Sequence, residues 1–364
     1  MAAPLISVVM PAFNREAYIA AAMTSILNQQ GCHLELLIID DGSTDRTPDI
    51  VTSFKDSRVR LLRHEHNLGI AASRNHGLAE ARGRYLANLD SDDIAHPQRL
   101  ALQAAFLEAH PALAAVGSWT WNLDAQGRRL PPWRGKKRRG NPLQPADVQA
   151  QLLFHVSVRN SSLMGRTAVL RRYGYREDFP LSQDYELLTR LARDHPVANI
   201  PLRLTGLRHH PGQTTQLKAA LKKGRLQAIA DQQLQWLGLS PSREDLEYFY
   251  WLLPRKGSPG ERPALDAAYL GWLNDYFATI EAANRTCCLM EQRALRHTLA
   301  IVYMATWKRA LLDTAGNGQS HHRLFKPRFL AGSVPAVHHA LWDACSGFLR
   351  ALRWPRPAQD HTID

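Results

Sequence analysis

Three aspartates stand close together after a short apolar stretch: Asp90, Asp92 and Asp93 follow Tyr85–Leu89. An apolar run of this length predicts a buried strand that ends in a loop. Because like charges at this spacing disfavour joint ionisation, a cation among the carboxylates would stabilise their charged forms. Asp90 and Asp92 can both turn toward one Mg²⁺ or Mn²⁺ ion, which commonly takes one or two carboxylates together with phosphate oxygens. The alternative is a solvated acidic turn in which Asp93 caps the following helix.

Segments with strand and helix patterns alternate around these acids. Strands are predicted at Leu5–Met10, Glu35–Ile39, Val59–Leu62, Tyr85–Leu89 and Ala114–Val116, and helices at Glu16–Gln29, from Thr47, at Ile70–Ala81 and at Pro97–Ala109. This alternation predicts an α/β fold with a mostly parallel sheet flanked by helices. Ligands of such sheets bind outside the carboxyl ends of the strands. Asn14, Asp40, Asp41, Asp90 and Asp92 are all expected there.

Composition sets wider bounds on the protein. The chain has 364 residues, 45% of them hydrophobic, and a formal charge of +12. We therefore expect a globular protein with room for two domains and an anionic partner, which charge alone does not identify. The cysteines show no metal-ligand spacing, so reduced thiols and a cytoplasmic location are expected. Neither a signal peptide nor a run of about eighteen apolar residues is present, and we expect neither secretion nor a membrane span.

Several motifs in order resemble those of family 2 glycosyltransferases of the GT-A fold. They are Ser7–Asn14, Ile38–Asp45, Asn67–Gly69 leading to Ala72–Asn75, Leu89–Asp93, Gln183–Leu187 and Arg208–Pro211. The resemblance covers residues 5 to about 216 and implies a Rossmann-like GT-A catalytic domain over residues 1–216. It also implies an inverting enzyme that moves a sugar from a nucleotide-diphosphate sugar, with a UDP-sugar as the expected donor, to an acceptor hydroxyl.

The resemblance implies a set of donor-binding residues. A carboxylate at a strand end can accept the ring N–H of uracil, and the second acid of the family's pair points to Asp41. Phe13 could stack on the base, and Arg74 resembles the basic residue near the donor phosphates. The alternatives are a helix-capping Asp41, a core Phe13 and a solvent-exposed Arg74. The remaining predicted donor-binding residues are Pro11, Asn14, Arg15 and Asp90.

The metal ligands implied by the resemblance come from two motifs. Asp92 and Asp90 are expected to bind a divalent ion, Mn²⁺ or Mg²⁺, as the cofactor. His210 is expected to approach the ion or the diphosphate. Leu207 stands where the family usually has an aromatic residue before Arg208.

Asp184 matches the family's catalytic base. Its motif predicts a helix with Ser182 as the N-cap and Asp184 in the first turn, where the helix dipole stabilises a carboxylate. A base that works at neutral pH needs that charged form. Gln183 replaces the acid that usually precedes the base, which removes a neighbouring negative charge. The alternative for Asp184 is a helix-start acid without a catalytic role.

The basic segment Gly135–Gly140 is expected either as a flexible lid that meets the acceptor or as a solvated charge run.

Residues beyond the resemblance predict a helical region. An α-helical C-terminal region over residues 217–364 is predicted, with helices at Lys218–Trp236, Arg243–Leu253, Ala264–Ala283, Met290–Leu312 and Val334–Leu352. Aromatic and basic residues around Trp307 and at 348–356 are typical of interfacial helices, so peripheral contact with the inner face of the membrane is expected. Simple helix packing is the alternative.

The predicted function is therefore sugar transfer in cell-surface polysaccharide or glycolipid synthesis. The expected partners are a nucleotide-sugar donor and a saccharide or lipid-linked acceptor, without nucleic acid. The alternatives are a non-catalytic nucleotide-sugar binding module and a nucleotidyltransferase. A dinucleotide-binding oxidoreductase is disfavoured, because no Gly-x-Gly-x-x-Gly follows the first predicted strand.

Overall fold

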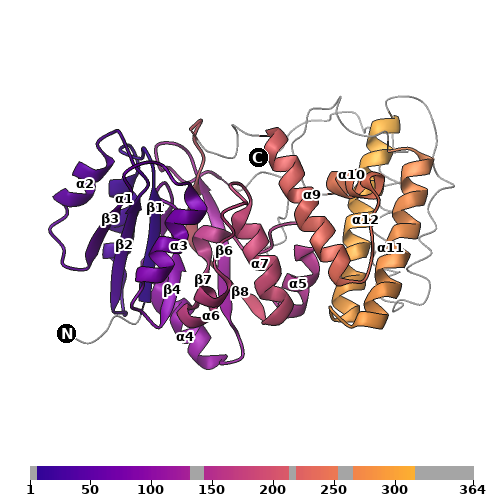
Figure 1. Cartoon of the computed structure of the whole chain (residues 1–364), viewed down its shortest axis with the longest axis horizontal. Coiled ribbons are helices and arrows are strands. Elements are labelled where there is room, and N and C mark those ends of the chain that lie inside the picture. The colour runs from indigo at the N-terminus through magenta and orange to yellow at the C-terminus, as the bar shows by residue number, and fades with distance from the viewer. Residues whose placement is uncertain (1–5, 132–142, 213–218, 253–264, 316–364) are drawn as a thin grey trace, which may run out of the picture. The chain divides into compact units, whose positions relative to one another are not determined.

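The computed structural model describes residues 6–131, 143–212, 219–252 and 265–315 (Figure 1). Contacts group the chain into two compact units. The first unit holds the sheet with its helices, α9 (Ala219–Trp236) and α10 (Arg243–Leu252), and the second holds most of α11 (Ala267–Cys287) and α12 (Gln292–Ala315). The predicted domain boundary near residue 216 stays a prediction.

A single mixed sheet carries the described strands in the order β3-β2-β1-β4-β7-β6-β8-β5. The strands are β1 (Ile6–Ala12), β2 (Leu34–Asp40), β3 (Val59–Arg63), β4 (Tyr85–Asn88), β5 (Ile94–Ala95), β6 (Ala115–Leu123), β7 (Met164–Arg166) and β8 (Val197–Arg208). β1 pairs in parallel with β2 and β4, β2 with β3, and β6 with β8. Only β7 and β5 run antiparallel to their neighbours among these strands. The predicted α/β fold with a mostly parallel sheet is confirmed.

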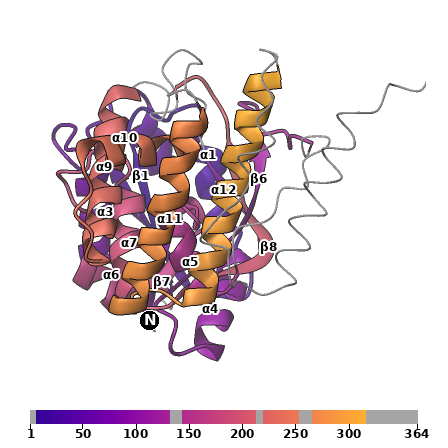
Figure 2. The same ribbon diagram turned by 90° about the vertical axis from the view of Figure 1, so that its right-hand side faces the viewer.

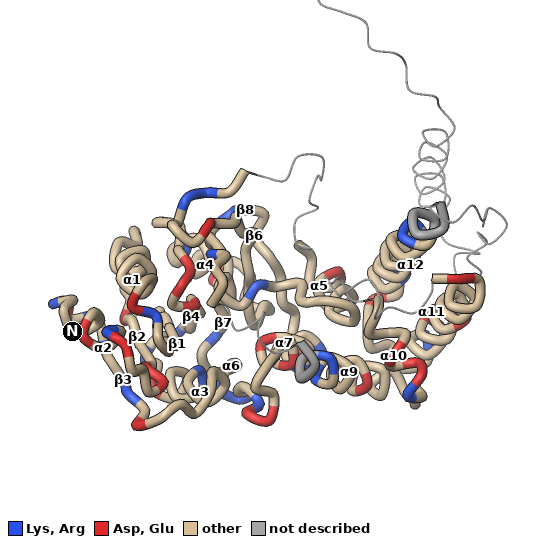
Figure 3. The backbone as a smooth tube through the Cα atoms, turned by 90° about the horizontal axis from the view of Figure 1, so that it is seen from above, with Lys and Arg blue, Asp and Glu red and all other residues tan. Residues whose placement is uncertain are grey.

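Helices cover both faces of the sheet. Seen from above, α1 (Ile19–Leu27) and α4 (Arg99–Ala109) lie on one side, and α3 (Ile70–Glu80) and α6 (Thr167–Tyr173) on the other (Figure 3). β2 is buried at every position, as expected of an apolar strand between two helical layers. Gly77 lets α3 approach β1, since a Cβ there would lie 2.5 Å from Val9 Cγ1. This close packing fixes the start of α3, where Arg74 lies, relative to the strand ends.

Some elements of the structure are longer than predicted, and one helix was not predicted. α2 (Thr47–Ser53) begins at the predicted residue, whereas α5 (Pro145–Leu152) was not predicted. β6 continues to Leu123 instead of ending at Val116. β6 shifts register against β8 around Trp119, and this irregularity interrupts the alternation that a sequence pattern could detect.

The predicted C-terminal helices are confirmed where the structure describes them. α11 and α12 run alongside each other in both ribbon views (Figures 1 and 2). Trp307 is only 3% exposed, which favours helix packing at that position, and peripheral membrane contact stays a prediction. The helix predicted at 334–352, the aromatic and basic residues at 348–356 and the basic segment 135–140 lie outside the described residues. Within the described ranges, the helices are too short or too polar to cross a membrane.

Candidate active site

The first group of polar residues surrounds Asp41, directly after β2. Its carboxylate accepts hydrogen bonds from the N–H groups of Leu68 and Gly69, both at 2.9 Å, and its Oδ1 lies 2.8 Å from His64 Nδ1. Asp41 is 4% exposed. A carboxylate has about four lone-pair positions, so one position remains for a further donor. Asp41 thus holds the segment before α3 against the end of β2.

The turn at Gly42 permits that contact. Gly42 has a φ of +75°, and a Cβ there would lie 2.7 Å from the carbonyl carbon of His66. Any other residue would strain the backbone and push the neighbouring segment away. On the far side of His64, its Nε2 lies 2.9 Å from His76 Nδ1, so the two imidazoles share one proton between them. Asp41 is therefore the first member of a part-buried polar chain that reaches α3.

The end of β1 contributes residues that shape this turn. Asn14, with a φ of +52°, accepts the Thr44 N–H on its side-chain oxygen at 2.9 Å. The Arg15 guanidinium donates to the carbonyls of Phe13 and Asn14 at 3.1 and 2.9 Å, and Pro11 lies within β1. Phe13 is 40% exposed, so the alternative of a core aromatic is wrong. The Asp41 N–H bonds to the carbonyl of Ala12, the residue before Phe13, at 2.8 Å.

The second group surrounds Arg74 on α3. Arg74 is 3% exposed, and its Nη2 donates to Asp90 Oδ1 at 2.8 Å. Its Nε and Nη1 are buried and have no hydrogen-bond partner among the described residues. Burial alone would lower the pKa of Arg74, but its interactions with Asp90, Tyr175 and Asp184 raise it above its ordinary value. The alternative of a solvent-exposed arginine is wrong.

The third group joins the loop after β4 to the end of β8. His210 Nε2 lies 2.9 Å from Asp92 Oδ2, and the imidazole packs against Tyr18 with ring centroids 4.5 Å apart. Asp93 Oδ1 accepts the Arg208 N–H at 2.9 Å. Burial and the charges of Asp92 and Asp90 raise the pKa of Asp93 well above its ordinary value. Asp93 is followed by β5 and not by a helix, so the alternative in which Asp93 caps a helix is wrong.

Asp184 lies in the first turn of α7 (Gln183–Asp194), as predicted. Ser182 stands at the N-cap position, but its φ is +64° and its side chain makes no capping bond, so the predicted side-chain cap is wrong. A serine in this conformation stores strain two residues before Asp184. Asp184 is close enough to the second group for its charge to raise the pKa of Arg74.

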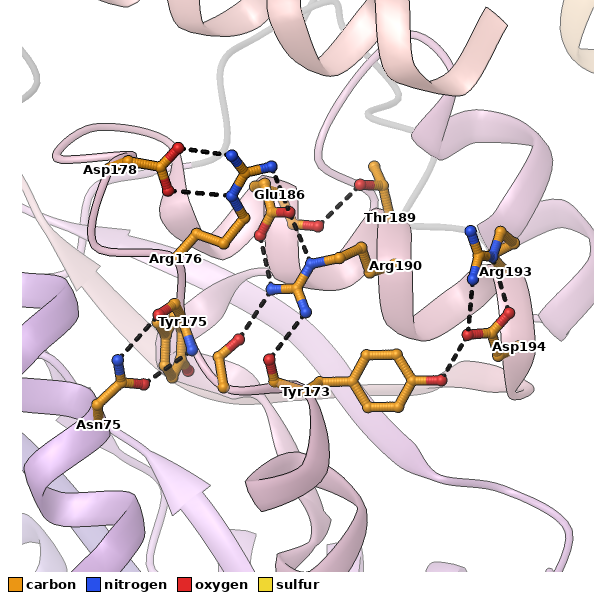
Figure 4. A network of polar contacts seen from close by, with 11 residues as sticks. Asn75, Tyr173, Tyr175, Arg176, Asp178, Glu186, Thr189, Arg190, Arg193 and Asp194 are labelled. Carbon is orange, nitrogen blue, oxygen red and sulfur yellow. Dashed lines mark hydrogen bonds and ion pairs between the residues drawn. The ribbon is translucent and has the colours of Figure 1, made fainter. Parts of the chain in front are cut away.

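Buried contacts fix α7 against the segment that follows α6 (Figure 4). Glu186 is fully buried and pairs with Arg190 Nε at 2.6 Å. The same guanidinium donates to the carbonyls of Tyr173 and Gly174, both at 2.8 Å. The Asn75 side chain on α3 exchanges two hydrogen bonds of 2.8 Å with the backbone of Tyr175. The segment from Tyr173 to Tyr175 thus connects the helix of Arg74 to the helix of Asp184.

Four buried polar residues near the site were missed by the sequence analysis: Asn88, Arg99, Asn160 and Tyr175. The side-chain amide of Asn88 donates to Asn160 Oδ1 at 3.0 Å and to the Tyr175 hydroxyl at 2.7 Å. Arg99 donates to the Asn88 carbonyl at 2.8 Å, and burial lowers its pKa to about 9 although the charges of Asp93 and Asp90 act in the opposite direction. A polar Asn88 inside an apolar strand was the one available signal.

Comparisons with known proteins agree on a single family. Residues 7–174 match the model of glycosyl transferase family 2. An uncharacterized glycosyltransferase of Haemophilus influenzae is 31% identical over 226 residues, which cover 59% of this chain and 68% of that protein. The chain belongs to glycosyltransferase family 2.

Two further comparisons place this glycosyltransferase among its relatives. It is 43% identical over 103 residues to the UDP-Glc:alpha-D-GlcNAc-diphosphoundecaprenol beta-1,3-glucosyltransferase WfgD of Escherichia coli, covering 28% of this chain and 41% of that protein. The structure of residues 1–349 of S. aureus TarS in complex with UDP-GlcNAc matches with a TM-score of 0.57 and 17% identity, covering 87% of this chain and 93% of that chain. The structural match supports the fold.

The side chains of this site provide some of the ligands that a divalent ion needs. Asp92 and His210 place a carboxylate and an imidazole in contact, while Asp90 Oδ1 pairs with Arg74. Within the described ranges, His, Cys, Asp and Glu side chains form no cluster of three or more with metal-binding geometry. Ions such as Mg²⁺ and Mn²⁺ commonly take one or two protein ligands and complete their coordination with phosphate oxygens and water. Asp92 and His210 suffice for that arrangement.

Proposed function

We propose that this glycosyltransferase inverts the anomeric configuration as it moves a sugar from a UDP-sugar to an acceptor hydroxyl. The observation that carries the proposal is the juxtaposition at one loop. Asp90 bonds to Arg74, and Asp92 bonds to His210. Asp184 lies near enough to Arg74 to raise its pKa. Cationic groups for a diphosphate and a carboxylate for an acceptor proton therefore lie in the same site.

The proposed reaction is a single displacement. The acceptor oxygen attacks the anomeric carbon while its proton passes to the Asp184 carboxylate. The bond between the anomeric carbon and the phosphate oxygen breaks, and its electron pair leaves with the nucleoside diphosphate. Arg74 lies buried where its unpartnered N–H groups would bind the developing negative charge of that leaving group.

The residues proposed to hold a divalent ion are Asp92 and His210. When bound, Mn²⁺ or Mg²⁺ would neutralise charge on the diphosphate as a Lewis acid. His210 needs its Nε2 lone pair to act as a ligand, and the hydrogen bond to Asp92 would then give way to coordination.

The proposed donor and acceptor classes come from a relative. WfgD is named for transfer from UDP-Glc to a sugar linked to diphosphoundecaprenol. A lipid-linked or saccharide acceptor and a place in cell-surface polysaccharide synthesis therefore belong to the proposal. Cytoplasmic location and peripheral membrane contact follow from such an acceptor, and the net charge of +12 is compatible with an anionic surface. The relatives named above are glycosyltransferases, which favours sugar transfer over nucleotidyl transfer.

Donor screening tests the proposal. The purified full chain is incubated with Mn²⁺ and UDP-, GDP- and dTDP-sugars, and release of nucleoside diphosphate is measured with and without chelator. We expect turnover with UDP-sugars that the chelator removes, and Asp92→Asn to reduce it to background while the melting temperature changes little. Turnover with GDP- or dTDP-sugars alone would overturn the donor, and full activity of Asp92→Asn would overturn the metal ligand.

A further inference from the structure

Three buried side chains form a polar network directly beneath the Arg74–Asp90 pair. Asn88, Asn160 and Tyr175 are 2%, 7% and 6% exposed. The Asn88 amide bridges the Asn160 side chain and the Tyr175 hydroxyl, at 3.0 and 2.7 Å. Buried polar groups are kept only where their hydrogen bonds are satisfied, so each of these contacts restricts the position of the other two residues.

This network contacts both members of the ion pair above it. The Arg74 guanidinium lies over the Tyr175 ring, with Cζ 5.4 Å from the ring centroid. The Asn160 amide donates to Asp90 Oδ1 at 3.3 Å, the same oxygen that accepts from Arg74 Nη2. One connected set of side chains therefore sets the plane of the guanidinium and the direction of the carboxylate.

The backbone of Tyr175 is fixed independently of its side chain. Asn75, one residue after Arg74 on α3, bonds to both the N–H and the carbonyl of Tyr175, each at 2.8 Å (Figure 4). The hydroxyl is anchored at the other end by Asn88 on β4. Because the residue is held at both ends, its ring cannot move away from Arg74 without breaking a buried hydrogen bond.

Arg74 needs such support because its own contacts do not fix it. Only Nη2 has a protein partner, whereas Nε and Nη1 are buried without one among the described residues. A guanidinium held by one hydrogen bond could rotate about it, and the two remaining donors would lose the common direction that bidentate binding of phosphate requires. The Tyr175 ring beneath the guanidinium restricts that rotation.

We propose that Tyr175, anchored by Asn88, is a positioning residue for donor binding that acts through Arg74. The inference rests on the proposed function, in which Arg74 binds the donor diphosphate. The ring keeps Nε and Nη1 directed at the phosphates before the donor arrives, so less conformational freedom is lost on binding. The anchoring hydroxyl distinguishes tyrosine from a merely apolar residue at this position.

Tyr175→Phe is the decisive variant, because it keeps the ring and removes the anchor. Calorimetry with UDP, GDP and dTDP in the presence of Mn²⁺ identifies the diphosphate that binds the wild-type full chain most tightly. For that diphosphate, we expect Tyr175→Phe to weaken binding about fivefold, the usual effect of one hydrogen bond. Tyr173→Phe is the matched control, since its hydroxyl bonds to Asp194 at 2.7 Å on the surface of the same segment. The control should bind like the wild type.

A double-mutant cycle separates positioning from a general effect on folding. In an Arg74→Ala background, we expect Tyr175→Phe to change affinity less than twofold, because the residue acts through Arg74. Equal losses in both backgrounds, or wild-type affinity of Tyr175→Phe, would overturn the inference while leaving the proposed function intact. Wild-type affinity of Arg74→Ala, or no binding of any diphosphate to the wild type, would overturn the proposed donor site. Melting temperatures of all variants identify any that fail to fold.

Discussion

Two buried ionic groups flank the ends of the central strands, and they differ in how far the protein satisfies them. The Asp41 carboxylate accepts from Leu68 and Gly69 and contacts His64, so protein groups occupy most of its hydrogen-bonding positions. The Arg74 guanidinium is as deeply buried, yet two of its nitrogen atoms have no partner in the described part of the chain. The protein supplies most of the hydrogen bonds that Asp41 can accept but leaves two nitrogen atoms of Arg74 without one. This difference indicates different roles for the two residues.

The difference follows from the cost of burying polar atoms. An unsatisfied buried donor costs roughly 1–3 kcal/mol, so such donors persist where a ligand completes them. By this criterion, Asp41 mainly orders the segment before α3. One lone-pair position of its carboxylate remains for the nucleotide base of the proposed sugar donor. In the proposed function, an anion completes the hydrogen bonding of Arg74. Asp184 also has no hydrogen-bond partner among the described residues, but it is part-buried, so solvent or an acceptor hydroxyl can reach it.

The largest effect is expected from the incomplete carboxylate. Asp184→Asn keeps the size of the side chain but cannot take the acceptor proton, so sugar transfer should fall about a hundredfold or more. Donor affinity and stability should stay close to wild type. Product release and calorimetry on the same protein check both expectations. Asp194→Asn, at the other end of α7, is the matched control and should keep full transfer. An active Asp184→Asn variant would remove Asp184 from the mechanism.

A smaller effect is expected when the incomplete cation is removed. Arg74→Met fills the same space without charge, and loss of charge-assisted bonds to the diphosphate should weaken donor binding by roughly tenfold to a hundredfold. Stability should change little, because the variant also removes two unsatisfied buried donors. Calorimetry and urea unfolding measure the two quantities. Arg84→Met, at a surface ion pair with Glu108, serves as the control. A large loss of stability with unchanged affinity would assign Arg74 a structural role.

The sequence located these reactive groups better than their partners, for a physical reason. Asp41, Asp92 and Asp184 each follow a strand or begin a helix, so short-range patterns predict where they lie. The partners come from distant segments: Asn160 is 72 positions from Asn88, and Tyr175 is 87 positions from it. Only tertiary packing brings such residues together, and no local pattern reports it. The network beneath Arg74 therefore could not be predicted.

Local sequence patterns likewise predicted only part of the fold. Buried strands such as β2 and amphipathic helices such as α1 have strong periodicity and were predicted to within a few residues. β6 extends through Trp119 and Trp121, where a register shift against β8 interrupts the alternation. α5 is short, so its pattern has little length in which to appear. Pairing with β8, and not local sequence, determines how far β6 extends.

A third prediction concerns the satisfied group. Asp41→Asn replaces an acceptor oxygen with an N–H donor that faces the N–H groups of Leu68 or Gly69, and should cost about 1–3 kcal/mol of stability. Urea unfolding followed by circular dichroism measures this loss. Leu68→Ala is the control for the side chain on the same segment, since Leu68 is 52% exposed and should lose much less. If Asp41→Asn is as stable as wild type while donor binding collapses, Asp41 belongs with Arg74 as a ligand-completed group.

The smallest effect is expected at a second satisfied carboxylate, Glu35 on β2, far from the reactive loop. Burial alone would raise its pKa, but hydrogen bonds from the Ser7 hydroxyl, the Arg82 N–H and the Arg60 guanidinium outweigh burial and lower it below 4.5. The pKa of Glu35 is lower in the folded protein than in the unfolded chain. Its charged form therefore stabilises the folded protein above pH 4.5, and this stabilisation is lost as the pH falls through the pKa of the folded state.

Glu35→Gln should therefore be less stable than wild type at pH 7, and the difference should shrink as the pH is lowered from 4.5 toward 3. Urea midpoints of both proteins at pH 7, 5, 4 and 3 measure that difference. Glu108→Gln, at an exposed ion pair, is the control and should show a smaller difference at every pH, because surface pairs contribute little. A Glu35→Gln difference that stays constant with pH would mean that shape, and not charge, stabilises this site.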